Sequence, residues 1–173
     1  MSDLRVVYDS DHIRKRIGEM AAVIAEDYAD QPLVLVGILK GSAFFLADLA
    51  RSFPRPVDFE FVDVAQSAGE RGEVVQLTYA TQIDVRDRHV LVLKDVVHSG
   101  ITENYLVTHL SQHQPRSIEV VAFVDRPQLR RVNLAAKYSV FTDLPDGFLV
   151  GYGLGPGRDH HTNRPDLCVI EEG

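Results

Sequence analysis

The first apolar pattern of the chain has the period of an amphipathic helix. Between residues 10 and 28, apolar side chains recur at every third or fourth position, namely Ile13, Ile17, Met20, Ala21, Ile24, Ala25 and Tyr28. Ser10 and Asp11 can cap this segment at its start, and Pro32 prevents its continuation. The spacing therefore predicts a helix that lays one face on a core.

Three continuous apolar runs follow, and their pattern is that of strands buried on both faces of a parallel sheet: Leu33–Ile38, Val90–Leu93 and Ile118–Val124. Helices are predicted from Ser42 to Arg51 and from the turn at 95–102 to about Gln114. Because strands alternate with helices, we expect an α/β fold, with a mostly parallel twisted sheet and helices on both of its faces.

The remaining segments are predicted to form shorter β-strands and one loop. Residues 66–73 are polar and contain Gly69 and Gly72, so they predict a loop. Strands are expected on either side of that loop and in the tail, at 57–64, 74–79, 138–141, 148–152 and 168–170. No repeat or linker interrupts the pattern, so residues 1–173 are expected to form a single domain.

Composition narrows the function classes. The 173 residues carry a net charge of −7, which disfavours nucleic acid as a partner because such a partner requires a basic face. No apolar run reaches the length of a membrane span, and the polar N-terminus does not resemble a secretory leader. Cys168 is the one cysteine, so no internal disulfide is possible. These features favour the cytoplasm.

The loops after Ile38 and Leu93 should carry chemistry, because α/β sheets bind ligands beyond the carboxyl ends of their strands. In the second loop, Ser99 and Thr102 supply hydroxyl groups, and Gly100 allows close approach of an oxyanion. Backbone N–H groups at a helix N-terminus favour an anion there, so the segment predicts a phosphate site. A capped helix without any ligand explains the same residues equally well.

Segment 90–102 resembles the diphosphoribose-binding motif of the type I phosphoribosyltransferases, in which a buried strand leads to acids, two apolar residues and Thr-Gly-x-Thr. Three further segments resemble the hypoxanthine-guanine branch of that family. Residues 36–49 match its pyrophosphate loop, 124–127 its purine-recognition segment and 145–154 its base-stacking segment. The four motifs occur in the family's order over about residues 5–170.

This resemblance implies a fold and an activity. The fold would be that of type I phosphoribosyltransferases, with a small hood built from the chain ends. The reaction would transfer ribose 5-phosphate from phosphoribosyl pyrophosphate to hypoxanthine or guanine and release pyrophosphate. The implied partners are phosphoribosyl pyrophosphate, a purine base and a purine nucleoside monophosphate. Mg²⁺ is the expected cofactor, and departures from the family pattern could weaken its binding here. A homodimer or homotetramer is implied as well.

Site residues follow from the same resemblance, by motif. The ribose and the 5′-phosphate would be bound by Lys94, Asp95, Val97, Ser99, Gly100, Ile101 and Thr102. Pyrophosphate would contact Leu39, Lys40 and Gly41, with a strained peptide near Leu39–Lys40. Arg126 would donate to the purine 6-oxo group, Phe148 would stack on the ring, and the backbone of Leu149 would read its edge. His98 would be the catalytic residue, and no metal ligand is assigned.

Several positions depart from the family pattern. Lys94 replaces an acid, His98 replaces the general-base aspartate, and Gly155 replaces a magnesium-holding aspartate. The loop at 65–73 lacks the Ser-Tyr pair of the family's lid, and Thr162 aligns with its pyrophosphate-binding arginine. The site thereby loses roughly three net negative charges. We therefore hypothesise that the protein binds a nucleoside monophosphate with less dependence on magnesium. The alternative function is a catalytically impaired protein that binds or senses this nucleotide.

Weaker patterns have simpler explanations. His109 and His113 could share a metal, but a solvated helix face accounts for them without a third ligand. The glycines at 151–157 lack the helix that a dinucleotide fingerprint requires. Lys94 could instead reach solvent or pair with Asp63. Transfer to another base or azole is also open, because base specificity depends on Arg126 and its neighbours.

Overall fold

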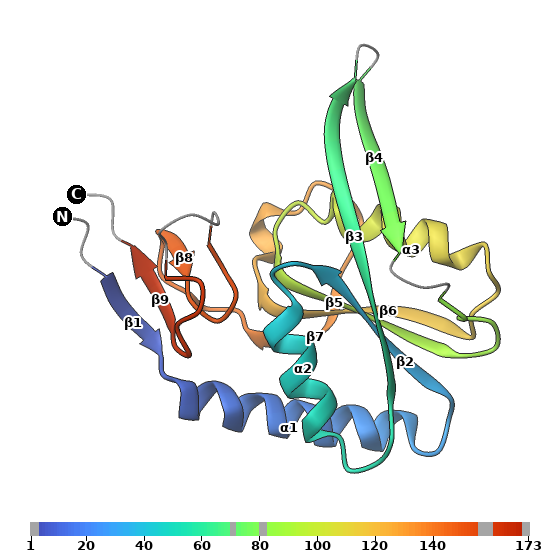
Figure 1. Ribbon diagram of the computed structural model, residues 1–173, viewed down its shortest axis with the longest axis horizontal. Helices are drawn as coiled ribbons and strands as arrows, with labels where there is room; N and C mark the ends of the chain where they lie inside the picture. Colours follow the sequence, from blue (N-terminus) through green and yellow to red (C-terminus); the bar gives the residue numbers. More distant parts are fainter. Residues whose placement is uncertain (1–3, 70–71, 80–82, 156–160, 171–173) are drawn as a thin grey trace.

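A six-stranded sheet lies at the centre of the protein, in the order β4-β3-β2-β5-β6-β7 (Figure 1). The computed structural model describes residues 4–69, 72–79, 83–155 and 161–170. The strands of this sheet are β2 (Leu33–Leu39), β3 (Asp58–Gly69), β4 (Gly72–Tyr79), β5 (His89–Val97), β6 (Ser117–Asp125) and β7 (Ala136–Phe141). β4 pairs antiparallel with β3, and the other neighbours pair in parallel.

Helices cover both faces of the sheet, as the alternating pattern predicts. The helices are α1 (Ser10–Tyr28), α2 (Ala43–Ser52), α3 (Ile101–Ser111) and a 3-10 turn, η1 (Pro127–Leu129). α1 and α2 join one core cluster with Leu35 and Leu91, whereas α3 joins the other with Val34 and Val90. Successive strand residues point to opposite faces, and this explains why the central strands read as uninterrupted apolar runs.

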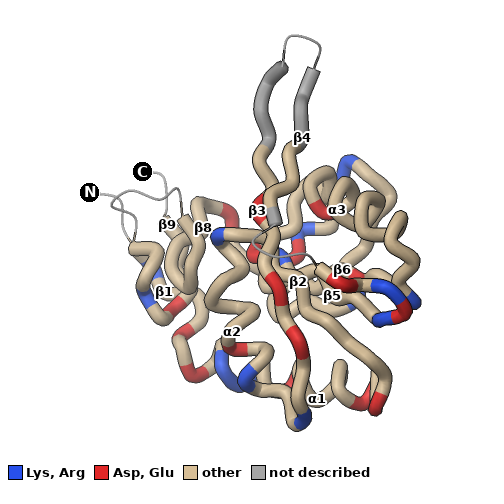
Figure 2. Tube along the Cα trace, turned by 45° about the vertical axis from the view of Figure 1, so that its right-hand side comes forward, with Lys and Arg blue, Asp and Glu red and all other residues tan. Residues whose placement is uncertain are grey.

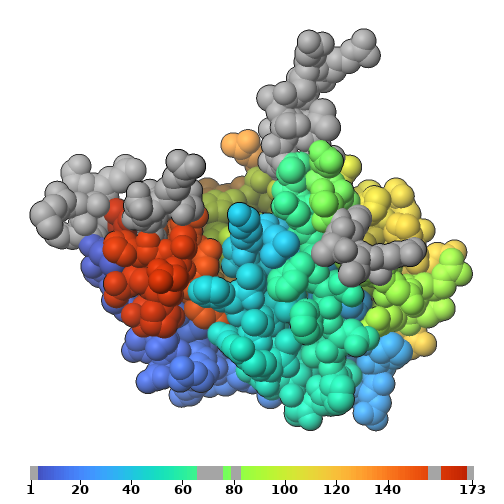
Figure 3. Space-filling view, viewed as in Figure 1, coloured from blue at the N-terminus to red at the C-terminus, as the bar shows by residue number. Residues whose placement is uncertain are grey.

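A second sheet of three strands forms the expected hood beside α1 and α2 (Figures 1 and 3). It contains β1 (Leu4–Tyr8), β9 (Leu167–Ile170) and β8 (Phe148–Val150), so segments from the two ends of the chain lie side by side. β1 was not expected from the sequence. Its five residues include no fully buried side chain, so they lack the alternation that marks a half-buried strand.

Several boundaries differ from the sequence-based expectation. The predicted loop at 66–73 is wrong, because β3 continues to Gly69 and β4 begins at Gly72, so the two strands pair almost to the tip of a long hairpin. Strand pairing satisfies the backbone hydrogen bonds of such an arm without an apolar sequence pattern. The predicted turn at 95–102 is also shorter, because β5 continues to Val97. The expected cap at Ser10 and Asp11 is wrong: α1 already begins at Ser10, and its cap is Asp9, whose carboxylate accepts a hydrogen bond from the His12 backbone N at 2.8 Å.

Lys and Arg positions are interspersed with Asp and Glu along the chain (Figure 2). Among the described residues, no helix is both long and apolar enough to cross a membrane.

Candidate active site

A cavity of about 350 Å³ lies where the carboxyl ends of β5 and β6 meet the hood. Its lining residues are Lys94, Asp95, Val96, His98, Arg126, Gly147, Phe148, Leu149, Leu154 and Gly155. Seven of the residues that the sequence singles out therefore share one cavity, although they come from three segments of the chain: Lys94, Asp95, His98, Arg126, Phe148, Leu149 and Gly155.

The loop between β5 and α3 has the geometry of an anion site. Gly100 precedes the first residue of α3 and adopts a left-handed conformation with φ of 78°. The hydroxyl of Ser99 accepts a hydrogen bond from the backbone N of Ile101 at 3.3 Å. Val97 ends β5, and Thr102 lies in the first turn of α3. Residues 97 and 99–102 thus surround a helix N-terminus next to the cavity, although they are not among its lining residues.

The loop after β2 contacts the end of β5. The peptide between Leu39 and Lys40 is cis, at the position where an unusual peptide is expected. Ser42 is buried, and its hydroxyl donates to the Ile38 carbonyl at 2.6 Å. A Cβ atom on Gly41 would lie 1.8 Å from Asp95 Oδ2, so no larger residue fits without displacing that carboxylate. Lys40 is exposed beside this contact.

For the reaction that the sequence resemblance implies, we expect Gly41→Ala to raise the KM for phosphoribosyl pyrophosphate at least about ten-fold, because the added methyl group must push Asp95 or the loop aside. Steady-state kinetics with the diphosphate varied measures this effect. The matched control is Gly18→Ala in α1, where an added Cβ meets nothing within 4 Å. This control should leave KM unchanged and stabilise the fold by about 0.5–1 kcal/mol in urea unfolding. An unchanged KM in Gly41→Ala would contradict the tight contact.

Lys94 and Asp95 form an ion pair inside the cavity, with 2.5 Å between Nζ and Oδ1. The suggested pairing of Lys94 with Asp63 is therefore wrong. Lys94 and Asp95 both line the cavity, and their side chains are only 22% and 19% exposed. Asp63, by contrast, is exposed to solvent. Behind the pair, Glu103 in α3 is only 2% exposed, and burial raises the pKa of its carboxyl group.

His98 and Arg126 bring basic groups to the same cavity. Partial burial lowers the pKa of His98 below its ordinary 6.5, and the nearby Arg126 guanidinium lowers it further, while Asp95 opposes this shift. The imidazole is therefore neutral at neutral pH and can accept a proton. Arg126 is held by hydrogen bonds from its backbone N to the Val97 carbonyl at 3.1 Å and from Nη2 to the Pro145 carbonyl at 3.4 Å.

The hood supplies an aromatic face and is fixed to the core. Phe148 lines the cavity with a side chain that is 48% exposed, which leaves a ring surface for a planar ligand. Tyr152 stacks on Phe123 with 4.6 Å between ring centroids, and its hydroxyl donates to Asp48 Oδ2 at 2.5 Å. A Cβ on Gly153 would lie 3.1 Å from the Gly41 carbonyl oxygen, so the hood loop also contacts the loop after β2.

Sequence reasoning missed three lining residues, Val96, Gly147 and Leu154. They lie within the motifs at 90–102 and 145–154, but apolar residues and glycines also occur throughout the core, so no chemical property distinguished them as ligand contacts. The rings of His109 and His113 lie 5.6 Å apart, and within the described ranges no group of three His, Cys, Asp or Glu residues could hold a metal. Gly157, one of the four glycines of the late run, lies outside the described residues.

Comparisons with known proteins agree with this geometry. Residues 6–155 match the family model of the phosphoribosyl transferase domain. A hypoxanthine-guanine phosphoribosyltransferase of Staphylococcus epidermidis is 36% identical over 96% of this chain and 93% of its own length. A hypoxanthine-guanine phosphoribosyltransferase of Aquifex aeolicus is 31% identical over 98% of this chain and 96% of its own length.

Solved structures give the same family. A hypoxanthine-guanine phosphoribosyltransferase of Bacillus anthracis superimposes with a TM-score of 0.88 at 27% identity and covers 99% of both chains. A mutant of the Trypanosoma cruzi hypoxanthine phosphoribosyltransferase, complexed with the product IMP, gives a TM-score of 0.86 at 33% identity over 98% of this chain and 92% of its own. The chain therefore belongs to the phosphoribosyltransferase family, and within it to the hypoxanthine-guanine phosphoribosyltransferases.

Proposed function

We propose that the protein is a purine salvage enzyme that transfers ribose 5-phosphate from phosphoribosyl pyrophosphate to hypoxanthine or guanine and releases pyrophosphate. The observation that carries this proposal is the single cavity in which Asp95, His98, Arg126 and Phe148 meet. The names of the relatives support a transferase and do not favour the alternative of a protein that only binds nucleotide.

The parts of the nucleotide have distinct places in this proposal. The 5′-phosphate binds the N–H groups and hydroxyls of residues 97–102 at the start of α3. The Asp95 carboxylate accepts a hydrogen bond from a ribose hydroxyl. The purine ring stacks on Phe148, and its 6-oxo group accepts a hydrogen bond from Arg126. The backbone of Leu149 forms hydrogen bonds with the edge of the ring. Pyrophosphate contacts residues 39–41. Lys94 contributes by orienting Asp95, to which it is paired.

His98 is the proposed general base. Bond formation at the purine ring nitrogen requires loss of that ring's proton, and a neutral imidazole in the same cavity can accept it. The positive charge that develops on the ribose in the transition state is stabilised by the Asp95 carboxylate. Little covalent work falls to the protein, so the rate depends on positioning and charge.

Magnesium enters this proposal as part of the diphosphate substrate. The family uses Mg²⁺, but among the described residues there is no cluster of three acids or histidines, and Asp95 is already paired with Lys94. Asp95 can still approach a cation that the diphosphate and ribose oxygens hold. Because the cavity is less acidic than the family pattern, we propose that nucleotide binding itself depends little on the metal.

The domain organisation, cellular location and assembly of the enzyme are also part of this proposal. Residues 1–173 act as one phosphoribosyltransferase-like domain in the cytoplasm, as a homodimer or homotetramer. Size-exclusion chromatography with light scattering measures the assembly, and a monomer at micromolar concentration would contradict it.

We expect Phe148→Ala to raise the KM for hypoxanthine about 5- to 150-fold, because loss of one base–aromatic stack costs roughly 1–3 kcal/mol. The KM for phosphoribosyl pyrophosphate should change little. The matched control is Phe59→Ala on β3, a phenylalanine that is 53% exposed and does not line the cavity. Equal increases in the KM for hypoxanthine from both substitutions would show that Phe148 does not bind the base.

A base panel tests the proposed function. The full-length protein is mixed with phosphoribosyl pyrophosphate, Mg²⁺ and one of hypoxanthine, guanine, xanthine or adenine, and nucleotide formation is followed from pH 6 to 9. We expect turnover of the 6-oxopurines hypoxanthine and guanine and none of adenine, which lacks the oxygen that Arg126 would bind. Turnover of adenine alone, or of none of the four bases, would refute the assignment.

A further inference from the structure

Arg130 makes an unusual set of contacts directly behind the phosphate loop. It follows η1, and its side chain is 12% exposed. Nη1 donates to the carbonyl oxygens of Val97 at 2.9 Å and His98 at 2.8 Å, and Nε donates to the Leu134 carbonyl at 3.0 Å. Nη2 forms an ion pair with the carboxylate of Asp125, the last residue of β6. All three nitrogens of the guanidinium therefore have partners.

Neighbouring backbone groups of the same segment hold the same loop. The backbone N of Arg126 donates to the Val97 carbonyl, and that of Arg131 donates to the Ser99 carbonyl at 2.9 Å. A Cβ on Gly100 would lie 3.3 Å from Arg130 Cδ, so the side chain also packs against the turn. The segment from Arg126 to Leu134 thus forms a bracket around the loop, and Arg130 is the charged side chain within it.

The contacts fix the direction in which the loop presents its donors. In a trans peptide the C=O and N–H groups point in opposite directions. When Arg130 holds the carbonyls of Val97 and His98, the N–H groups of His98 and Ser99 therefore point away from Arg130. Successive N–H groups in a turn of this kind form a concave anion site, and the left-handed Gly100 completes the turn.

We propose that Arg130 is a positioning residue for the 5′-phosphate, which presets the N–H donors of the loop at 97–100 before substrate arrives. Arg130 does not line the cavity, so it acts through the loop rather than on the ligand. A planar guanidinium can bridge adjacent carbonyls and a carboxylate at once, whereas a lysine ammonium cannot reproduce this fork. The inference rests on the proposed function for the identity of the ligand, but its test requires no turnover.

The test compares binding of guanosine monophosphate and guanosine to full-length Arg130→Lys by titration calorimetry. The variant keeps the charge and loses the fork. We expect the affinity for the monophosphate to fall about 10- to 100-fold, the effect of losing hydrogen bonds to a charged group. The affinity for guanosine, which has no phosphate, should stay within about two-fold. A general loss of structure would weaken both ligands equally.

Two further variants keep the inference falsifiable. Arg131→Lys is the matched control, because Arg131 is exposed and its loop contact comes from the backbone N; it should bind both ligands like wild type. Asp125→Asn keeps an acceptor for Nη2 and leaves the carbonyl contacts in place, so the ratio of the two affinities should stay within about two-fold of wild type. An unchanged ratio in Arg130→Lys, or an equal loss in Asp125→Asn, overturns the inference.

Discussion

Replacing His98 with asparagine should lower kcat about 100- to 10,000-fold, the usual contribution of a positioned general base. Asparagine retains polarity but cannot take up a proton. The wild-type profile of kcat/KM should rise through an acid limb below pH 6.5, because burial and Arg126 lower the pKa of His98 and only its neutral form accepts a proton. This limb should be absent from the variant.

His98→Asp separates proton transfer from packing. A carboxylate titrates well below imidazole, so this variant should retain turnover with its acid limb displaced to lower pH. Initial rates of nucleotide formation across about pH 4.5–8, with wild type and both variants, measure these effects. If the asparagine variant kept both the wild-type rate and the acid limb, His98 would not be the base.

Asp95→Asn should reduce kcat about 100- to 1,000-fold, comparable to the loss of one preorganised electrostatic group in other active sites. The substitution removes the carboxylate that would face the developing charge on the ribose and leaves Lys94 unpaired, so the cavity gains a positive charge. Single-turnover kinetics at saturating substrate isolate this step. Binding of the nucleoside monophosphate should weaken much less than kcat falls, because the transition state bears more charge than the ground state.

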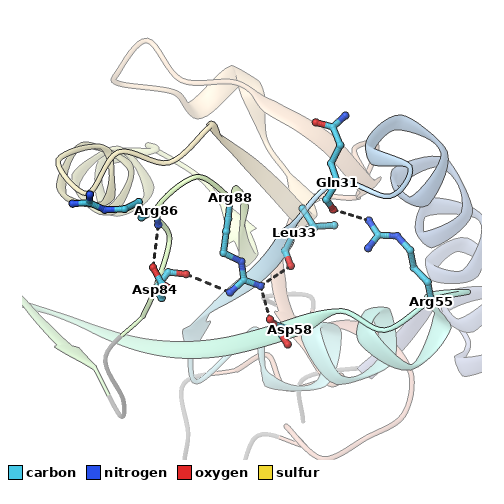
Figure 4. A network of polar contacts seen from close by, with 7 residues as sticks. All are labelled: Gln31, Leu33, Arg55, Asp58, Asp84, Arg86 and Arg88. Carbon is cyan, nitrogen blue, oxygen red and sulfur yellow. Dashed lines mark hydrogen bonds and ion pairs between the residues drawn. The ribbon is translucent and has the colours of Figure 1, made fainter.

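Asp58→Asn is the matched control for this substitution. Asp58 Oδ2 also lies 2.5 Å from a basic nitrogen, Nη2 of Arg88, within a network of polar contacts (Figure 4). That network joins the first residue of β3 to the residue before β5, at the amino-terminal edge of the parallel strands, opposite the candidate site. We expect wild-type kcat and at most about 1 kcal/mol loss of stability. Comparable losses of kcat in Asp95→Asn and Asp58→Asn would show that Asp95 has no specific role in catalysis.

The central sheet could be predicted because its strands are buried on both faces. The runs at 33–38, 90–93 and 118–124 became β2, β5 and β6, with boundaries extended by one to four residues. The strands at 57–64 and 74–79 were predicted, but the continuation of β3 and β4 through the polar segment 66–73 was not, because backbone pairing between the two strands requires no apolar pattern. β1 pairs with β9 from the other end of the chain, and no local pattern reports such a partner.

The candidate site was predictable where its chemistry is carried by motifs. The phosphate loop, the cis peptide after Leu39 and the aromatic at Phe148 lie in segments that the family resemblance marks. The contacts of Arg130 could not be predicted, because its acceptors are mainly backbone carbonyls and its position in the sequence does not show them. The pairing of Lys94 with its own neighbour was not predicted either, because the sequence does not show that Lys94 and Asp95 line one cavity while Asp63 is exposed.

The most direct test of the account is a crystal structure of the full-length protein with guanosine monophosphate. We predict that the 5′-phosphate accepts hydrogen bonds from the loop at 97–102, that a ribose hydroxyl lies within hydrogen-bonding distance of Asp95, and that the base stacks on Phe148 with its 6-oxo group at Arg126. A nucleotide bound outside this cavity, or with its phosphate away from the start of α3, would contradict the account.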